Sequence, residues 1–153
     1  MFIEEELKKY GDKNIRVYLD MDGTIVHYDI DGAYDYDKKR PLLDRIDKVK
    51  YLNDNYPNIT FYILSICHEK KQIDEKNIWL DKYLPYIEKD NRVIIVRDPK
   101  GLITSGDVKR NYLNQLDTKD TIILIDDDVR ILKAVKSNNR NHVVLYKDSI
   151  LSD

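Results

Sequence analysis

Short apolar runs alternate along the chain with longer amphipathic segments. The runs have the length of buried strands and occupy residues 15–19, 59–64, 93–96, 121–125 and 142–146. Apolar residues recur at helical spacing in the segments at about 3–10, 42–52, 70–84, from 109 onward and after 128. Strands that alternate with helices predict an α/β fold in three layers, with a five-stranded parallel sheet between helices.

Residues 25–40 differ from the rest of the chain because they are rich in Tyr and Asp and lack a helical period. We expect a hairpin or flap there, ending at Pro41, a residue that suits the start of the next helix. The chain has 153 residues and contains no repeat, low-complexity segment or linker-like change of composition. We therefore expect a single domain, residues 1–153.

Composition narrows the class of protein. Hydrophobic residues make up 42% of the chain and charged residues 35%, as in soluble globular proteins. The net charge of -2 provides no bulk attraction to nucleic acid or to a membrane. No basic segment followed by an apolar one opens the sequence, and the single cysteine, Cys67, excludes an intramolecular disulfide and a cysteine-rich zinc site. These features predict a cytoplasmic protein.

Polar side chains follow three of the expected strands. Asp20 comes after the first strand, Ser65 after the second and Asp126 after the fourth. In parallel sheets, ligands bind beyond the carboxyl ends of the strands, so these residues are expected to share one cleft. Asp20 and Asp22 can both turn into that cleft, and Gly23 allows the backbone to bend closely around a ligand such as phosphate.

A second acidic group, Asp126-Asp127-Asp128, faces the first across the expected cleft. So many carboxylates require a cation, and ligands that are all oxygen favour Mg²⁺. A carboxylate nucleophile, a metal and cationic donors meet the needs of phosphoryl transfer. Each feature alone has a simpler explanation: the acidic group can cap a helix, and the spacing D-x-D-G recurs at 29–32 in what we interpret as solvated flap.

Taken together, the features resemble the four motifs of the haloacid dehalogenase-like hydrolases. The matching runs are RVYLDMDGT at 16–24, FYILS at 61–65, a lysine after the third strand, and ILIDDD at 123–128. The run 63–85, with its EK-x-x-WL pattern, is similar to the deoxyribonucleotidase-like branch. The resemblance implies a Rossmann-like sheet of order 5-4-1-2-3. Short intervals between the motifs leave a minimal cap, residues 25–40, or none.

The resemblance also implies a role for each matching residue. Asp20 would form the aspartyl-phosphate, and Asp22 would protonate the leaving oxygen and then activate water. Asp20, the backbone carbonyl of Asp22, Asp127 and Asp126 would hold Mg²⁺, with Asp127 favoured as the direct ligand and Asp128 as a helix cap. The residues implied in phosphate binding are Ser65, Lys109, Gly23 and Thr24.

Some assignments stay open at the level of sequence. Lys100 is the alternative to Lys109; we favour Lys109 because it heads the pattern KRNYL, whereas Lys100 lies in a turn-forming run. His27 and His68 could border the cleft. A cysteine phosphatase is excluded, because its C-x5-R loop would need arginine where this chain has Ile73.

The sequence thus predicts a Mg²⁺-dependent phosphomonoester hydrolase, with a small phosphorylated substrate such as a (deoxy)nucleoside monophosphate. The first alternative is a phosphatase that acts on phosphorylated nucleic-acid ends, toward which the basic cluster Lys38-Lys39-Arg40 points. The second is a binding module without catalysis; it is disfavoured because both the nucleophile and its acid partner are present.

Overall fold

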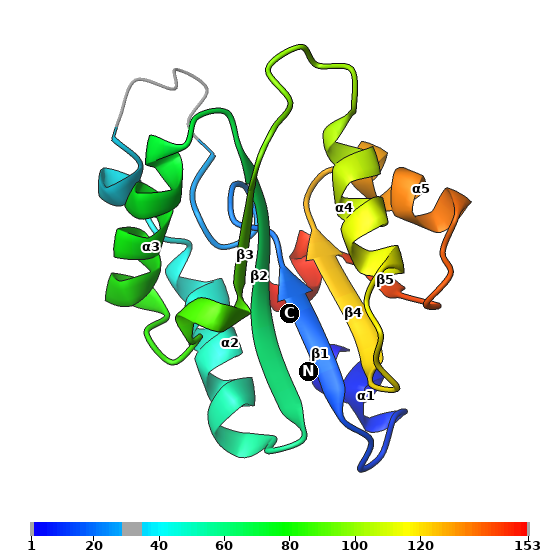
Figure 1. The fold of residues 1–153 in the computed structure, drawn as a ribbon. Helices are drawn as coiled ribbons and strands as arrows, with labels where there is room; N and C mark the ends of the chain where they lie inside the picture. The colour runs from blue at the N-terminus through cyan, green and yellow to red at the C-terminus, as the bar shows by residue number, and fades with distance from the viewer. Residues whose placement is uncertain (1, 29–34, 153) are drawn as a thin grey trace.

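The computed structural model describes residues 2–28 and 35–152, and the structural statements below refer to these residues. One sheet of parallel strands runs through the molecule in the order β3-β2-β1-β4-β5 (Figure 1). The strands are β1 (Ile15–Leu19), β2 (Ile59–Cys67), β3 (Arg92–Val96), β4 (Thr121–Asp126) and β5 (Val144–Lys147). This is the expected order read from the other edge, so the predicted sheet and its order are confirmed.

Helices cover both faces of the sheet, as the alternating pattern predicted (Figure 1). They are α1 (Phe2–Lys8), α2 (Leu43–Asn55), α3 (Lys71–Tyr83), α4 (Ser105–Asn114) and α5 (Val129–Ser137), with short 3₁₀ helices η1 (Tyr36–Lys38), η2 (Lys89–Asn91) and η3 (Asp148–Ser152). The first three helices and η3 pack on one face, and α4 and α5 on the other. No helix in the described part of the chain is long and apolar enough to cross a membrane.

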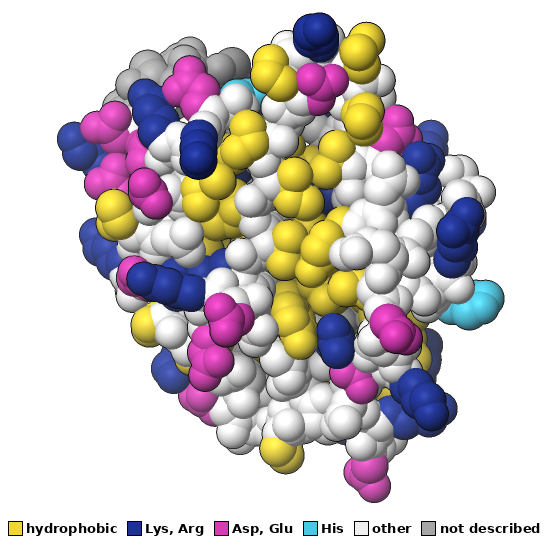
Figure 2. Space-filling view, in the orientation of Figure 1, with side chains coloured by type: hydrophobic (Ala, Val, Ile, Leu, Met, Phe, Trp, Pro, Cys, Tyr) yellow, Lys and Arg dark blue, Asp and Glu magenta, His cyan; other side chains and the backbone are white. Residues whose placement is uncertain are grey.

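The alternation of side chains along β1 divides the core. Val17 and Leu19 point into the larger cluster under α1 to α3, while Tyr18 points into the smaller one and stacks on Tyr62 at 4.6 Å between ring centroids. The second face is covered less completely: apolar side chains show at the surface between α3 and α4 in Figure 2, where Val93 and Ile95 are only partly buried.

Three boundaries differ from the expectation. β2 continues to Cys67, so Ser65 lies inside the strand rather than after it. α4 begins at Ser105, which places Lys109 in its second turn rather than at its start; Thr104, not foreseen as a cap, accepts a hydrogen bond from the N–H of Asp107. β5 begins two residues late because His142 has a positive φ of 52° that breaks the strand.

The register of the strands brings the motif residues to one edge. Leu19, the last residue of β1, lies opposite Ile63 of β2 and Ile125 of β4. The residues that follow, Asp20 and Asp126, therefore emerge side by side. The second D-x-D-G run, at 29–32, lies outside the described residues, while the flanking parts of the expected flap are tied to the core by a bridge between Val26 and Pro41.

Candidate active site

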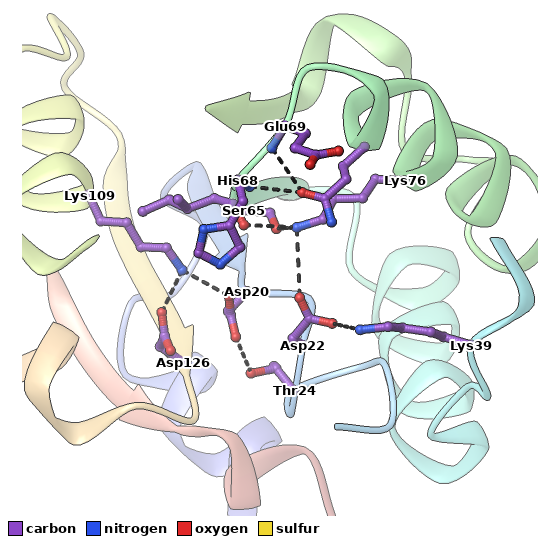
Figure 3. Close-up of polar contacts among 12 residues, drawn as sticks. Asp20, Asp22, Thr24, Lys39, Ser65, His68, Glu69, Lys76, Lys109 and Asp126 are labelled. Atoms are coloured by element: carbon purple, nitrogen blue, oxygen red, sulfur yellow. Dashed lines mark hydrogen bonds and ion pairs between the residues drawn. The ribbon is translucent and has the colours of Figure 1, made fainter. Parts of the chain in front are cut away.

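Asp20 lies at the centre of the polar cluster beyond the sheet (Figure 3). Its backbone N–H donates to the carbonyl of Ile125, which extends the sheet pairing by one residue. Lys109 Nζ donates to Asp20 Oδ1 at 2.9 Å, and the hydroxyl of Thr24 donates to Oδ2 at 3.2 Å. With both oxygens held, the carboxylate has a fixed orientation at the floor of the cleft.

Lys109 is the lysine that reaches the cluster, as expected from its position in the sequence. Its ammonium also donates to Asp126 Oδ2 at 2.7 Å, and the side chain is 1% exposed. Burial lowers the pKa of Lys109, but the adjacent Asp20 and Asp126 outweigh this effect and the pKa rises, so the charge is kept. Lys100 instead lies in an exposed turn whose N–H groups are bound by Asp98.

Asp20, Asp126 and Asp127 form a cluster in which one oxygen of each carboxylate lies within 4.8 Å of the others. Burial, together with the neighbouring Asp20, raises the pKa of Asp127 to about 8 and that of Asp126 to about 6. One lysine does not neutralise three carboxylates, so the cluster has the charge and the oxygen donors that suit Mg²⁺. These residues could hold such an ion.

Gly23 allows Asp127 to approach the loop after β1. It has a φ of 83°, and a Cβ at this position would collide with the carboxylate of Asp127. Its N–H is donated to the carbonyl of Val26, and the N–H of Thr24 to the carbonyl of Met21, so both residues contribute the shape of the loop. Within residues 2–28 and 35–152, the N–H groups of Met21 and Asp22 have no acceptor and are the ones left to bind a phosphate oxygen.

A second buried lysine, Lys76 of α3, was not foreseen as a site residue. Its ammonium donates to Ser65 Oγ at 2.6 Å and to the carbonyl of Ile66, and it lies 3.8 Å from Asp22 Oδ2. Burial lowers its pKa, and Asp22 partly offsets that effect. The sequence did carry a signal: Lys76 shares the apolar face of its helix with Ile73 and Leu80, where a charge needs a partner.

Asp22 is held from the other side by the described end of the flap. Lys39 Nζ lies 3.2 Å from Asp22 Oδ1, and both Lys39 and Lys76 lie over the ring of Tyr36, at 4.6 and 5.0 Å from its centroid. The indole N–H of Trp79 donates to the carbonyl of Lys39 and anchors this segment to α3. Within the cluster Lys38-Lys39-Arg40, the central residue faces Asp22, whereas Lys38 and Arg40 are exposed at the surface.

The remaining sequence candidates lie around this centre. Asp128 accepts a hydrogen bond from the N–H of Arg130 at 2.9 Å and caps α5, which confirms its interpretation as a helix cap. Cys67 is buried in the core, and burial raises the pKa of its thiol. His68 borders the cleft, whereas the ring of His27 lies 3.4 Å from the guanidinium of Arg40.

The cleft above the cluster has a volume of about 530 Å³. It is lined by residues at or after the carboxyl ends of β1 to β4 and by residues of α4 and α5: Asp20, Asp22, Tyr28, Ile66, His68, Arg97, Ser105, Lys109, Asp126, Asp127, Asp128, Val129, Arg130 and Ile131. Acidic groups occupy its floor, and two arginines lie among its lining. The space is large enough for a small phosphorylated substrate.

The chain resembles known proteins in its three-dimensional structure but not detectably in its sequence. The sequence matches no protein-family model and no curated protein sequence. The class C acid phosphatase from Bacillus anthracis with tungstate bound is similar in structure, with a TM-score of 0.60 and 18% identity over 97% of this chain and 73% of that chain. A second structure of that phosphatase has a TM-score of 0.59, with 18% identity over 97% of this chain and 72% of that chain.

A chain of the Pnkp1/Rnl/Hen1 complex has a TM-score of 0.60 and 14% identity over 90% of this chain, which corresponds to 47% of that chain. At these identities the similarity establishes the fold alone. The sheet order, the position of the acidic cluster and these neighbours agree, and the chain has the haloacid dehalogenase-like fold.

Proposed function

We propose that this chain is a Mg²⁺-dependent phosphomonoester hydrolase that works through an aspartyl-phosphate on Asp20. The observation that carries the proposal is the oriented carboxylate of Asp20, hydrogen-bonded to Lys109 and within reach of Asp126 and Asp127. Asp22 stands beside it between two cations, Lys76 and Lys39. A nucleophile, an acid-base partner and compensating charge are thus present in one cleft.

In the proposed reaction, an oxygen of Asp20 attacks phosphorus while the bond from phosphorus to the ester oxygen breaks. Asp22 protonates the departing oxygen, and its carboxylate then takes a proton from the water that attacks phosphorus and releases Asp20. Lys109, and Ser65 with the ammonium of Lys76, would hold the oxygens of the phosphoryl group. Mg²⁺, held by Asp20, Asp126, Asp127 and the carbonyl of Asp22, would neutralise charge on that group.

For the substrate, we propose a small phosphate monoester, with (deoxy)nucleoside monophosphates as the first candidates because of the resemblance along 63–85. Phosphorylated nucleic-acid ends are the second candidate, which is favoured by a pocket of about 410 Å³ beside the cleft that Arg97 and Arg130 line. A binding module without catalysis is opposed by the presence of both Asp20 and Asp22. We further propose that residues 1–153 act as one domain with 25–40 as a reduced cap, in the reducing cytoplasm that the single Cys67 suits.

The test is hydrolysis of an aryl phosphate with Mg²⁺ or with a chelator. Hydrolysis should need the metal, and Asp20→Asn should lower the rate by at least about a thousandfold, because an amide is not a nucleophile of this kind. Asp117→Asn, at an exposed position between α4 and β4, makes the same chemical change away from the cleft and should retain activity. An unchanged rate in Asp20→Asn would refute the mechanism.

A further inference from the structure

Arg97 directly follows β3 and lines the cleft beside Asp20 and Lys109. Its backbone N–H donates to the carbonyl of Cys67 at 2.7 Å, which ties it to the end of β2. The side chain is half-buried, and its guanidinium has no hydrogen-bond or ion-pair partner in the parts of the chain that the structure describes. A half-buried arginine of this kind has donors available for a ligand.

The other cations around the cleft are already engaged. Lys109 pairs with Asp20 and Asp126, Lys76 with Asp22, and Arg130 with Asp128 at 3.2 Å. The acid next to Arg97 in the sequence is engaged too, since the carboxylate of Asp98 accepts from the N–H groups of Lys100 and Leu102 at 3.1 and 3.4 Å. Arg97 therefore forms no ion pair with a side chain of residues 2–28 and 35–152.

Arg97 also lines a second pocket of about 410 Å³, which we call the side pocket. Its lining is Arg97, Thr104, Ser105, Gly106, Asp128, Arg130 and Ile131, and all of these except Thr104 and Gly106 line the cleft as well. The two spaces therefore adjoin at Arg97. A substrate that places one group at Asp20 can extend another past Arg97 into the side pocket.

We propose that Arg97 determines specificity by binding a second phosphate of the substrate in the side pocket. This inference rests on the proposed function, in which Lys109 and Lys76 serve the phosphate being removed. The planar guanidinium offers paired donors that match two phosphate oxygens. Its electrostatic attraction to a phosphate is stronger in a half-buried position than in open solvent. The substrate class is therefore a phosphate monoester with another phosphate nearby, as in a nucleoside bisphosphate or a phosphorylated end of a nucleic-acid strand.

Steady-state hydrolysis with Mg²⁺ should be compared for thymidine 3′,5′-bisphosphate and the two thymidine monophosphates. The product formed from the bisphosphate shows which of its two phosphates is removed, and the monophosphate that carries this phosphate is the reference substrate. The wild-type protein should prefer the bisphosphate by about ten- to hundredfold in kcat/KM, mainly through KM. Arg97→Gln should reduce this ratio to about one, and Arg97→Lys should keep part of it. Arg140→Gln, an exposed arginine at the opposite edge of the sheet, should keep the wild-type ratio.

A wild-type ratio near one, or a ratio that survives Arg97→Gln, overturns the proposal. A 3′-phosphorylated dinucleotide distinguishes the two possible substrates, because an enzyme specific for nucleic-acid strands prefers it to the bisphosphate and an enzyme specific for free nucleotides does not. Either preference supports the role of Arg97. If no ester is hydrolysed at all, the proposed function fails instead. Calorimetric binding of the bisphosphate and of the monophosphates to Asp20→Asn, with and without Arg97→Gln, then tests the arginine separately.

Discussion

Lys76 shows how a single buried charge can connect the parts of the site. Its ammonium links Ser65 of β2 to Asp22 of the loop after β1, although its pKa is lowered by burial. Its burial costs free energy that Asp22 offsets only in part, so we propose that Lys76 serves the proposed reaction more than it serves stability. Its position favours stabilisation of a negatively charged phosphoryl group between Ser65 and Asp22.

Replacing this lysine separates its two effects. Lys76→Met should lower kcat for an aryl phosphate by about ten- to thousandfold, since one charged donor to the phosphoryl group is lost. The melting temperature should change little, because the desolvated charge is removed and Asp22 keeps Lys39 as its partner. Lys82→Met, on the exposed side of the same helix, is the matched control. Unchanged kcat together with a large drop in melting temperature would assign Lys76 to structure instead.

At the scale of elements, Arg45 of α2 connects the loop after β1 to the C-terminal η3. Its Nη1 donates to the carbonyls of Gly23 and Thr24 at 3.0 and 3.1 Å and lies 2.8 Å from Asp148 Oδ2. Its Nε donates to the hydroxyl of Ser152. One guanidinium thus fixes the loop that carries Asp20 and Asp22 against two elements that are distant in the sequence.

Removing this connection should affect both stability and catalysis. Arg45→Met should destabilise the protein by about 2 kcal/mol, because Asp148 loses the shorter of its two ion pairs and the carbonyls of Gly23 and Thr24 lose a donor. It should also lower kcat by letting the loop move. Urea denaturation and aryl phosphate kinetics measure the two effects, with Lys50→Met on the exposed face of α2 as the control. Asp148→Asn should reduce the free energy of unfolding less in the Arg45→Met protein than in the wild-type protein. If the effects of the two substitutions are fully additive, the two residues are not coupled.

At the scale of the whole molecule, the carboxyl edge of the sheet concentrates negative charge that the fold must tolerate. The pKa of Asp127 is raised to about 8 and that of Asp126 to about 6 by burial and by Asp20. Groups whose pKa is higher in the folded than in the unfolded protein stabilise the fold while protonated, and this contribution is lost as the pH rises through the folded pKa. The metal-free protein should therefore lose stability from about pH 4, where these groups ionise in the unfolded chain, to about pH 8, the folded pKa of Asp127.

Magnesium should reverse this loss by binding the ionised cluster. At a hundredfold excess over its dissociation constant it should add about 2.7 kcal/mol, or at least about 5 °C in melting temperature, with a larger effect at pH 9 than at pH 5. Thermal melts with Mg²⁺ or a chelator across this range measure the effect. In Asp127→Asn both the pH dependence and the response to Mg²⁺ should shrink; a response of wild-type size would place the metal elsewhere.

Much of the architecture and most of the central residues could be predicted from the sequence, because they depend on local patterns. Apolar runs of strand length identify each strand, and in a parallel sheet their carboxyl ends share one edge, so the meeting of Asp20 with Asp126 follows from pattern and topology together. The boundaries were less accurate. Ser65 lies within β2 because pairing with β3 extends that strand to Cys67.

Only the tertiary structure decided which side chains from different elements complete the site. The rotation of α3 against the sheet brings Lys76 to Ser65 and Asp22. Gly23 and Asp127 approach closely because two loops 104 residues apart in the sequence meet. The guanidinium of Arg97 is left without an ion pair within the described residues because the nearby acids have other partners. Hydrophobic periodicity records which face of an element is buried, but the partner it meets there is set by packing across the whole chain. Local sequence patterns were therefore enough to predict the fold, whereas the balance of charges in its cleft depends on contacts between distant parts of the chain.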